Sequence, residues 1–199
     1  MSEMSIFGAT VVGVTCKDGV ILASEKRIAW NNMIITKNAK KIFLINDRIA
    51  IGSAGLTSDF QVLIRSIQAQ INIYELQNRR KMSVKAVAKL ISNILYQRKF
   101  MPLFVQTIIV GMDEDGPKLY TLDPAGSLID DKYATAGTGS PVSIGVLERE
   151  YKDTLTVAQA EKMVVAAIKA GISRDAMSGD GIDLIKITNK GAKEKTVKL

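Results

Sequence analysis

Two patterns of apolar positions succeed one another along the chain, one with the period of a strand and one with the period of a helix. Apolar residues alternate with others at 9–16 and 19–25, on either side of Asp18-Gly19, a dipeptide typical of a tight hairpin. A second pair of strands is predicted at 42–45 and 48–52. We therefore expect the first quarter of the chain to be β structure.

The period then changes to that of a helix. Apolar side chains that recur every three or four positions predict helices over 57–80 and 84–98. Thr57 or Ser58 is the expected N-cap of the first helix, and Ser83 precedes the second.

In the rest of the chain, further strands are followed by a second pair of helices and a last strand. The expected strands are 103–112, 118–122, 127–130, 132–136 and 182–188, and the expected helices are 141–150 and 157–171. The last helix follows Thr156, which forms a capping-box pattern with Gln159. Residues from Asn189 onward are polar and are expected to fray.

Strands in blocks and helices in pairs favour an α+β fold with antiparallel sheets over a doubly wound parallel sheet. Two strand blocks and two helix pairs predict a four-layer αββα sandwich, with two antiparallel sheets inside and a helix pair on each outer face. The sequence has no repeat of fixed period and no low-complexity linker, so we expect one domain over 9–189, preceded by a short propeptide at 1–8 and followed by a basic tail at 190–199.

Composition indicates an ordinary globular protein of a reducing compartment. Of the 199 residues, 47% are apolar and 24% are charged, and no apolar run approaches the roughly 20 residues that a membrane helix needs. Residues 1–8 lack the features of a secretory signal. The single cysteine, Cys16, excludes an internal disulfide and is more typical of a small buried residue than of a nucleophile. We expect a cytoplasmic protein without a membrane partner.

The sequence contains no histidine. This excludes Ser-His-Asp and Cys-His catalysis and most zinc chemistry. A hydrolytic mechanism would need a lysine, a carboxylate or an α-amine as its base. We expect no metal and no organic cofactor.

The formal net charge of +7 allows two interpretations. One is a surface for nucleic acid, and the other is a solvated face with a basic tail. The lysines are dispersed, with tight clusters only at Arg79-Arg80-Lys81 and in the tail from Lys190 to Lys198, and no nucleic-acid-binding motif accompanies them. We favour the solvated face.

The segment Gly8-Ala-Thr-Val-Val-Gly13 resembles the processing site of an N-terminal-nucleophile hydrolase. Such a chain cuts itself after the glycine, and the hydroxyl of the next residue becomes the nucleophile. The new α-amine, with a pKa of roughly 7.7–8, acts as the general base. Here the next residue is Ala9, which has no hydroxyl, so we expect neither self-cleavage after Gly8 nor peptide hydrolysis.

Several further motifs, each weak alone, occur in a highly specific order and spacing. They are Cys16-Lys-Asp-Gly19, Ala23-Ser-Glu-Lys-Arg27, Lys40-Lys-Ile42, Ala54-Gly55 and Arg174-Asp-Ala-Met-Ser-Gly179. Together with Gly8-Ala9 they resemble a proteasome β subunit of the archaeal type, from Gly8 to about Thr188. The αββα fold of that family agrees with the predicted layers.

The resemblance assigns the nucleophile and its cation. Ala9 occupies the place of the nucleophilic threonine, and Gly8-Ala9 that of the processing site. Lys41 matches the active-site lysine and Glu25 its acidic partner. A positioned ammonium lowers the pKa of the hydroxyl that it faces, and the carboxylate sets the lysine's charge and place.

The resemblance also assigns the groups around the nucleophile. Thr138 falls where the family usually has a serine that hydrogen-bonds the amine, and it keeps the hydroxyl. Asp175 and Ser178 match the pair that orients the nucleophile and its amine. Gly55 matches the glycine whose N–H forms the oxyanion hole. Ser53 matches the residue that shapes the pocket for the side chain before the scissile bond.

Each assignment has an ordinary structural alternative. Charged residues such as Glu25 and Lys41 are usually solvated, and Asp175 and Ser178 could cap a helix end. Gly55 could be a helix-entry glycine, and Ser53 a small strand residue packed under a neighbour.

Two residues compete with assigned ones. Lys40 could serve as the active-site lysine as well as Lys41 by its chemistry, and only its spacing from position 9 disfavours it. Thr10 is the rival nucleophile, but neighbouring side chains of a strand face opposite sides, so it should face away from the site.

Three functions follow in order of preference. The first is a threonine endopeptidase subunit of the proteasome core, silent because of Ala9; the second is a structural β subunit that never cuts; the third is a basic nucleic-acid-binding protein. The retained Glu25, Lys41, Asp175 and Ser178 favour the first and suggest a deliberate change at Ala9 over natural loss. The resemblance implies a seven-membered β ring, an adjacent α ring, a ring ATPase as regulator and unfolded polypeptide as substrate.

Overall fold

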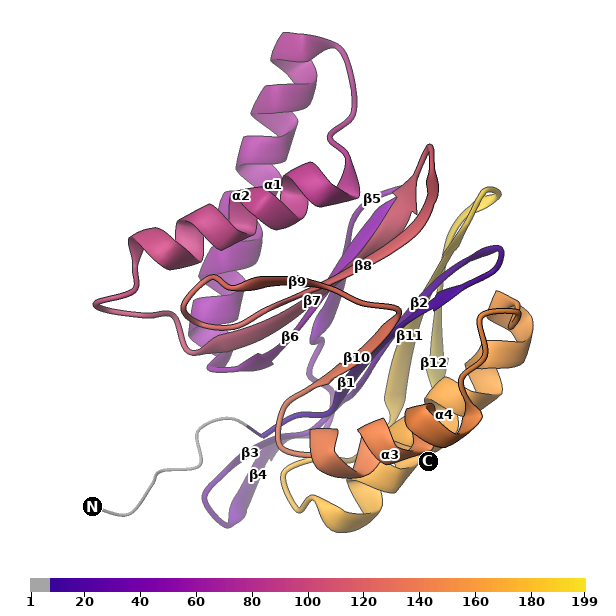
Figure 1. The fold of residues 1–199 in the computed structure, drawn as a ribbon. Coiled ribbons are helices and arrows are strands. Elements are labelled where there is room, and N and C mark those ends of the chain that lie inside the picture. The colour runs from indigo at the N-terminus through magenta and orange to yellow at the C-terminus, as the bar shows by residue number, and fades with distance from the viewer. Residues whose placement is uncertain (1–7) are drawn as a thin grey trace.

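The computed structural model describes residues 8–199, in which two five-stranded antiparallel sheets lie face to face between two pairs of helices (Figure 1). The predicted α+β class and the four-layer αββα sandwich are confirmed. Of the expected propeptide, all residues before Gly8 lie outside the described residues.

The two sheets draw their strands from different parts of the chain. The first contains β1 (Val11–Cys16), β2 (Gly19–Glu25), β10 (Tyr133–Ala136), β11 (Ile182–Thr188) and β12 (Gly191–Val197). Its order is β10-β1-β2-β11-β12. The second contains β5 (Ile42–Asn46), β6 (Ile49–Gly55), β7 (Val105–Asp113), β8 (Gly116–Leu122) and β9 (Leu128–Asp130), paired in that order.

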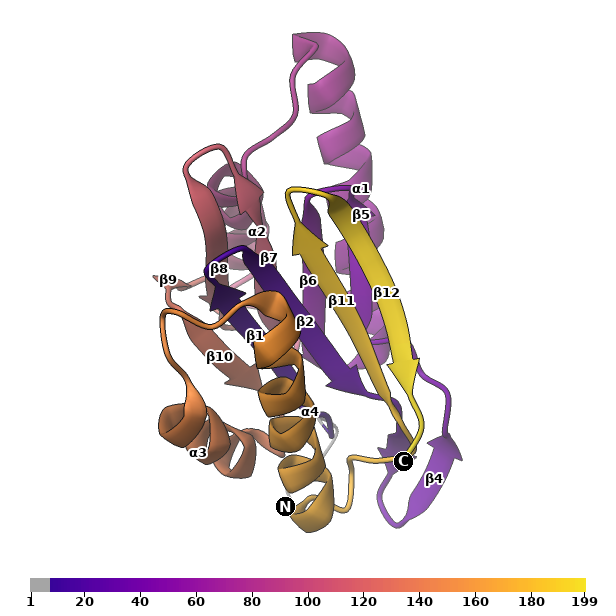
Figure 2. The same cartoon turned by 90° about the vertical axis from the view of Figure 1, so that its right-hand side faces the viewer.

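One helix pair covers each outer face. The helices α1 (Thr57–Asn78) and α2 (Val84–Gln97) pack on the second sheet, and α3 (Ser140–Glu150) and α4 (Val157–Arg174) pack on the first (Figures 1 and 2). Ser83 caps α2, and Thr156 and Gln159 form the predicted capping box of α4.

Three apolar layers hold the sandwich together. Residues of the two sheets that face each other, among them Val11, Leu22 and Ile108, form the central layer. The two outer layers lie between each sheet and its helices. Cys16 belongs to one of these outer layers, and burial raises the pKa of its thiol to about 12, which agrees with a packing role.

The polar C-terminal tail is not frayed, which corrects the expectation. Residues Gly191–Val197 form β12, which pairs with β11 along its whole length and ends the first sheet. An edge strand can be rich in charge because one of its sides faces solvent. Lys195 reaches Glu161 of α4 at 2.8 Å, and Glu194 reaches Lys40 at 3.1 Å.

The structure differs from the prediction in two smaller respects. A hairpin of β3 (Ile28–Trp30) and β4 (Met33–Thr36) was not predicted, because its apolar side chains are largely exposed and alternate weakly. Helix α1 already includes Thr57, and the N-cap position is taken by Leu56. The amide of Leu56 donates to the carbonyl of Phe104 at 2.8 Å, so strand pairing continues up to the first turn of the helix.

Candidate active site

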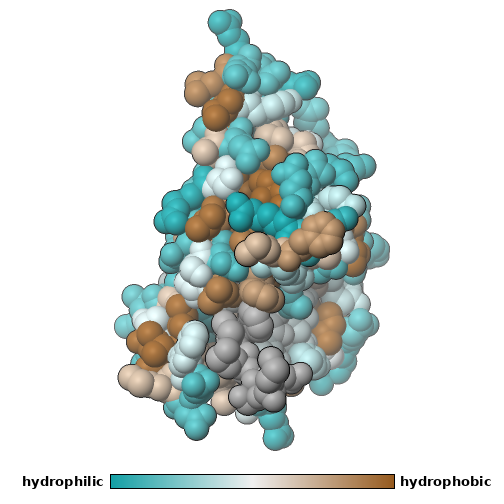
Figure 3. Space-filling view, turned by 90° about the vertical axis from the view of Figure 1, so that its left-hand side faces the viewer, coloured by the Kyte–Doolittle hydropathy of each residue, from teal (hydrophilic) through white to brown (hydrophobic). Residues whose placement is uncertain are grey.

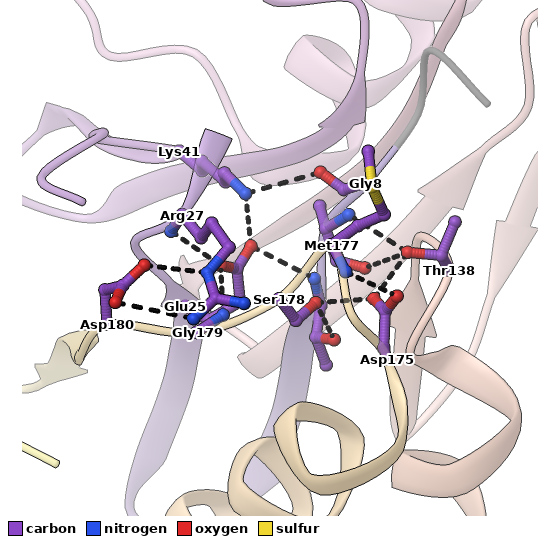
Figure 4. Close-up of polar contacts among 12 residues, drawn as sticks. Gly8, Glu25, Arg27, Lys41, Thr138, Asp175, Met177, Ser178, Gly179 and Asp180 are labelled. Carbon is purple, nitrogen blue, oxygen red and sulfur yellow. Dashed lines mark hydrogen bonds and ion pairs between the residues drawn. The ribbon is translucent and has the colours of Figure 1, made fainter. Parts of the chain in front are cut away.

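The candidate site lies at the start of β1, where the end of β2, the segment before β5, the turn after β10 and the loop after α4 meet (Figure 4). Ala9 is buried, and its methyl group belongs to the central apolar layer. Its amide donates to Oγ1 of Thr138 at 3.3 Å, and its carbonyl accepts from the amide of Gly139 at 3.2 Å. The backbone of Ala9, directly after the expected cleavage point, is therefore held in place.

Lys41 and Glu25 form a buried ion pair beside this peptide, which we call the lysine half of the site. The ammonium of Lys41 also donates to the carbonyl of Gly8 at 3.4 Å (Figure 4). The neighbouring Lys40 also borders the cavity beside Gly8, but its ammonium pairs with Glu194 at 3.1 Å. The structure thus brings Lys41, and not Lys40, to the Gly8–Ala9 bond.

The carboxylate of Glu25 accepts donors at both oxygens. Oε1 accepts from Lys41 and, at 3.4 Å, from the amide of Thr10. Oε2 accepts from the amides of Arg27 at 2.7 Å and Gly179 at 3.0 Å. A buried carboxylate needs such partners, because an unsatisfied charge in the interior is very costly.

Burial dominates the protonation of this pair. Removal from water lowers the pKa of Lys41 below that of an ordinary lysine, although the Glu25 carboxylate opposes the change. Removal from water likewise raises the pKa of Glu25, against the opposing effect of Lys41. The two pKa values are thereby drawn toward each other, which makes a proton easier to move between the pair and a nearby group.

The second part of the site, which we call the hydroxyl half, consists of Thr138, Asp175 and Ser178. Asp175 accepts hydrogen bonds from Thr138 at 2.5 Å and from Ser178 at 2.6 Å (Figure 4). Since a carboxylate only accepts, both hydroxyl protons point at Asp175. The lone pairs of Thr138 are then free to receive the amide proton of Ala9, as its 3.3 Å contact shows.

Thr10 faces away from the central layer, as expected for the neighbour of Ala9. It packs against Gly139 and Gly171 on the helix side of the first sheet. Its hydroxyl is nevertheless hydrogen-bonded to that of Ser178 at 2.8 Å. Because the hydroxyl proton of Ser178 goes to Asp175, the hydroxyl of Thr10 is the donor in its hydrogen bond to Ser178. Thr10 thereby extends the hydroxyl half on the helix side of the first sheet.

Gly55 and Ser53 line a cavity of about 40 Å³ together with Gly8, Ala9 and Lys41. Gly55 has a φ of 134°, and a Cβ atom there would lie 2.1 Å from the carbonyl oxygen of Phe104, so only glycine fits. The hydroxyl of Ser53 donates to the carbonyl of Gln106 at 3.0 Å, and its small side chain leaves the cavity open.

Sequence reasoning missed Arg27 and Asp180, which form an ion pair at 2.7 Å next to the lysine half. Arg27 stands in one of the motifs, but its partner is 153 positions away, so spacing gave no signal of the pairing. Within residues 8–199 the structure has no group of three or more His, Cys, Asp or Glu residues that could hold a metal ion.

Comparison with known proteins identifies relatives over the whole chain. A family model described as "Proteasome subunit" matches residues 6–187. The protein named "Proteasome subunit beta 2" of Pyrobaculum calidifontis is 44% identical over 199 residues, which cover 100% of this chain and 98% of that protein. "Proteasome subunit beta 1" of Staphylothermus marinus is 43% identical, with 94% and 88% covered, and "Proteasome subunit beta 1" of Hyperthermus butylicus is 45% identical, with 90% and 89% covered.

Proposed function

Because the chain belongs to the proteasome β-subunit family, we propose that it is a β subunit of a proteolytic core and that this copy neither processes itself nor cuts peptides. The observation that carries the proposal is the contrast at position 9. Ala9 presents a methyl group where threonine chemistry needs an oxygen, while both halves of the site are assembled around it.

The geometry indicates how a hydroxyl at position 9 would act. Its oxygen would attack the carbonyl carbon of Gly8, forming an ester, while the C–N bond to residue 9 breaks and that nitrogen takes up a proton to become the α-amine. Water would then hydrolyse the ester and release the segment that ends at Gly8. Lys41 already contacts the Gly8 carbonyl, and Thr138 already contacts the nitrogen that would leave. The same groups would serve the attack on a substrate.

Assembly into rings is part of the proposal. We expect a seven-membered β ring stacked on an α ring, a ring ATPase that feeds unfolded polypeptide, and a cytoplasmic location. The surface supports assembly, because large apolar side chains are exposed in several places, and Figure 3 shows apolar patches on one face between hydrophilic ones. The exposed large apolar side chains of residues 8–199 include Trp30, Met33, Ile35, Ile73, Leu76, Phe100 and Met101.

Two alternatives have weaker support. A purely structural β subunit has no use for a buried Lys41–Glu25 pair, which costs desolvation energy. A nucleic-acid surface would need free cations, yet several lysines pair with carboxylates, among them Lys81 with Asp47 and Lys132 with Asp153. Among residues 8–199, no helix is long and apolar enough to span a membrane.

The test is Ala9→Thr, with Ala9→Val as the control of equal shape that lacks the oxygen. We expect intact mass spectrometry of the assembled unmodified chain to show residues 1–8 still attached, and Ala9→Thr to lose them and hydrolyse fluorogenic peptides. Ala9→Val should behave like the unmodified chain. If Ala9→Thr assembles but neither cleaves itself nor turns over peptide, the chain is a structural subunit.

A further inference from the structure

The side chain of Arg27 spans the loop that follows α4 and holds it at both ends. Figure 4 shows the end at Asp180. Its Nε donates to Oδ2 of Asp180 at 2.7 Å, and its Nη2 to Oδ1 of the same residue at 3.4 Å. Its Nη1 donates to the carbonyl of Ala176 at 2.9 Å. One guanidinium thus ties together the two ends of the segment 176–180.

That segment delivers two groups to the site. The amide of Gly179 donates to Oε2 of Glu25 at 3.0 Å, and Ser178 belongs to the hydroxyl half. The guanidinium also lies directly on Gly179, where a Cβ atom would be 2.4 Å from Nη2 and 2.5 Å from Cζ of Arg27. The loop can therefore come this close to Arg27 only because residue 179 has no side chain.

Arg27 also contacts Glu25 directly through its backbone. Its backbone amide donates to the same Oε2 at 2.7 Å. Glu25 is thus enclosed between the backbone of Arg27 and a loop that the side chain of Arg27 holds. The loop residue Asp180 has a φ of 68°, an unfavourable conformation for a residue with a side chain, and its ion pair with Arg27 offsets that cost.

We propose that Arg27 is a positioning residue, which presses the 176–180 loop onto Glu25 and so keeps the Lys41–Glu25 pair dry and Ser178 in register with Asp175. The structural part of this proposal stands on the contacts alone, and its consequence for catalysis rests on the proposed function. A lysine would not replace Arg27, because the planar fork reaches Asp180 and Ala176 simultaneously and a single ammonium does not.

The structural part is tested in the unmodified chain, with Arg27→Gln, Arg27→Lys and Asp180→Asn. The control is Lys26→Gln, which removes the adjacent ion pair with Asp183 at 3.1 Å and leaves the loop contacts of Arg27 intact. We expect the amides of Ser178 and Gly179 to exchange hydrogen about tenfold faster in both Arg27 variants, the equivalent of one charge-assisted hydrogen bond. Asp180→Asn should have a smaller effect, and Lys26→Gln none.

A second readout separates positioning from general loosening. The charged groups that act on Lys41 are Glu25, Asp175 and Arg27. Loss of Arg27 removes a like charge and admits water, so both effects raise the pKa of Lys41 toward its ordinary value. Labelling of lysines with acetic anhydride at several pH values, read by mass spectrometry, measures this pKa. Arg27→Gln should raise it and Lys26→Gln should not.

Catalysis is tested in the Ala9→Thr background. There we expect Arg27→Gln and Arg27→Lys to lower kcat by about 10²-fold with little change in KM, as for a misplacement of catalytic groups. An inactive Ala9→Thr parent would refute the proposed function, whereas the exchange and labelling results would still decide the role of Arg27. Unchanged exchange and an unchanged pKa of Lys41 in Arg27→Gln, or full activity of Arg27→Lys, would overturn the positioning role.

Discussion

The lysine half and the hydroxyl half of the site meet at the same peptide bond but use opposite means. In the lysine half, two full charges are buried together, and Glu25 requires donors from three backbone amides besides Lys41. In the hydroxyl half, Asp175 is shared by the hydroxyls of Thr138 and Ser178. Burial shifts pKa values in the first half, whereas hydroxyl groups do not ionise at working pH.

This difference separates two tasks. Under the proposed function, the lysine half would regulate charge and proton movement beside the carbonyl of Gly8, and the hydroxyl half would fix the position of the nitrogen of residue 9. Damage to the first should therefore change the rate strongly and its pH dependence. Loss of a hydroxyl from the second should change the rate modestly and leave the alkaline decline that Lys41 sets in place, because the charges of Glu25 and Asp175 that act on Lys41 remain. The variants that separate the two halves are compared in the Ala9→Thr background.

The largest effect is expected from Lys41→Ala. Loss of a positioned cation next to the reacting oxygen should lower kcat by roughly 10²–10³-fold, as for other electrostatic groups in active sites. Lys40→Ala is the matched control, because Lys40 pairs with Glu194 on the surface and should leave the rate unchanged. Peptide hydrolysis measures both. Near-normal turnover by Lys41→Ala would remove the lysine half from the mechanism.

A smaller loss is expected from Thr138→Val. It removes one hydrogen bond to the nitrogen of residue 9 and one to Asp175, which corresponds to a rate loss of about tenfold. Thr138→Ser keeps the hydroxyl and should retain the rate. If Thr138→Val were as damaging as Lys41→Ala, the two halves would not differ in kind.

Ser53→Met should change preference more than rate. Ser53 borders the cavity beside Lys41, and its small uncharged side chain favours acceptance of bulky apolar residues before the scissile bond. Methionine would fill that space and shift the preference toward small residues by at most about tenfold. A panel of peptides that differ only at this residue measures the change. An unaltered preference would mean that other residues, or an adjacent subunit, set the pocket.

The smallest expected effect is on the pH profile of kcat/KM, which distinguishes the two halves of the site. Because burial lowers the pKa of Lys41, its ammonium loses its proton at lower pH than an ordinary lysine, whose pKa is about 10.4. The alkaline decline of kcat/KM should therefore fall below that value. Thr138→Val should lower the whole curve without moving this decline. A decline that moves with Thr138→Val would show that the two halves titrate together.

The layers of the fold could be predicted because their periods are strong. Alternation at 9–16 and the apolar spacing of 157–171 follow directly from burial on one face. The edge strand β12 and the β3–β4 hairpin could not, because exposed strands need no apolar alternation. Thr57 has the chemistry of an N-cap, but pairing of Leu56 with Phe104 places it inside the helix.

The candidate site depended on resemblance more than on pattern. Glu25 and Lys41 look like surface charges in the sequence, and only the fold buries them together. Their distance from Ser178 along the chain also hides the hydrogen-bond network, since Gly179 reaches Glu25 across 154 positions. Arg27 lay within a recognised motif, yet its function as a tie depends on a loop that no local pattern connects to it.

Position 8, before the proposed cleavage point, has no room for a side chain. A Cβ atom at this position would lie 2.2 Å from Cβ of Met177, an atom close to the backbone that cannot swing aside as the end of a flexible side chain could. Any other residue at position 8 would push the loop that carries Ser178 away from Asp175 and Glu25. For the self-cleavage proposed for Ala9→Thr, the residue before the cut is consequently set by the folded body, and Gly8→Ala would disturb the residues proposed to carry out the cut.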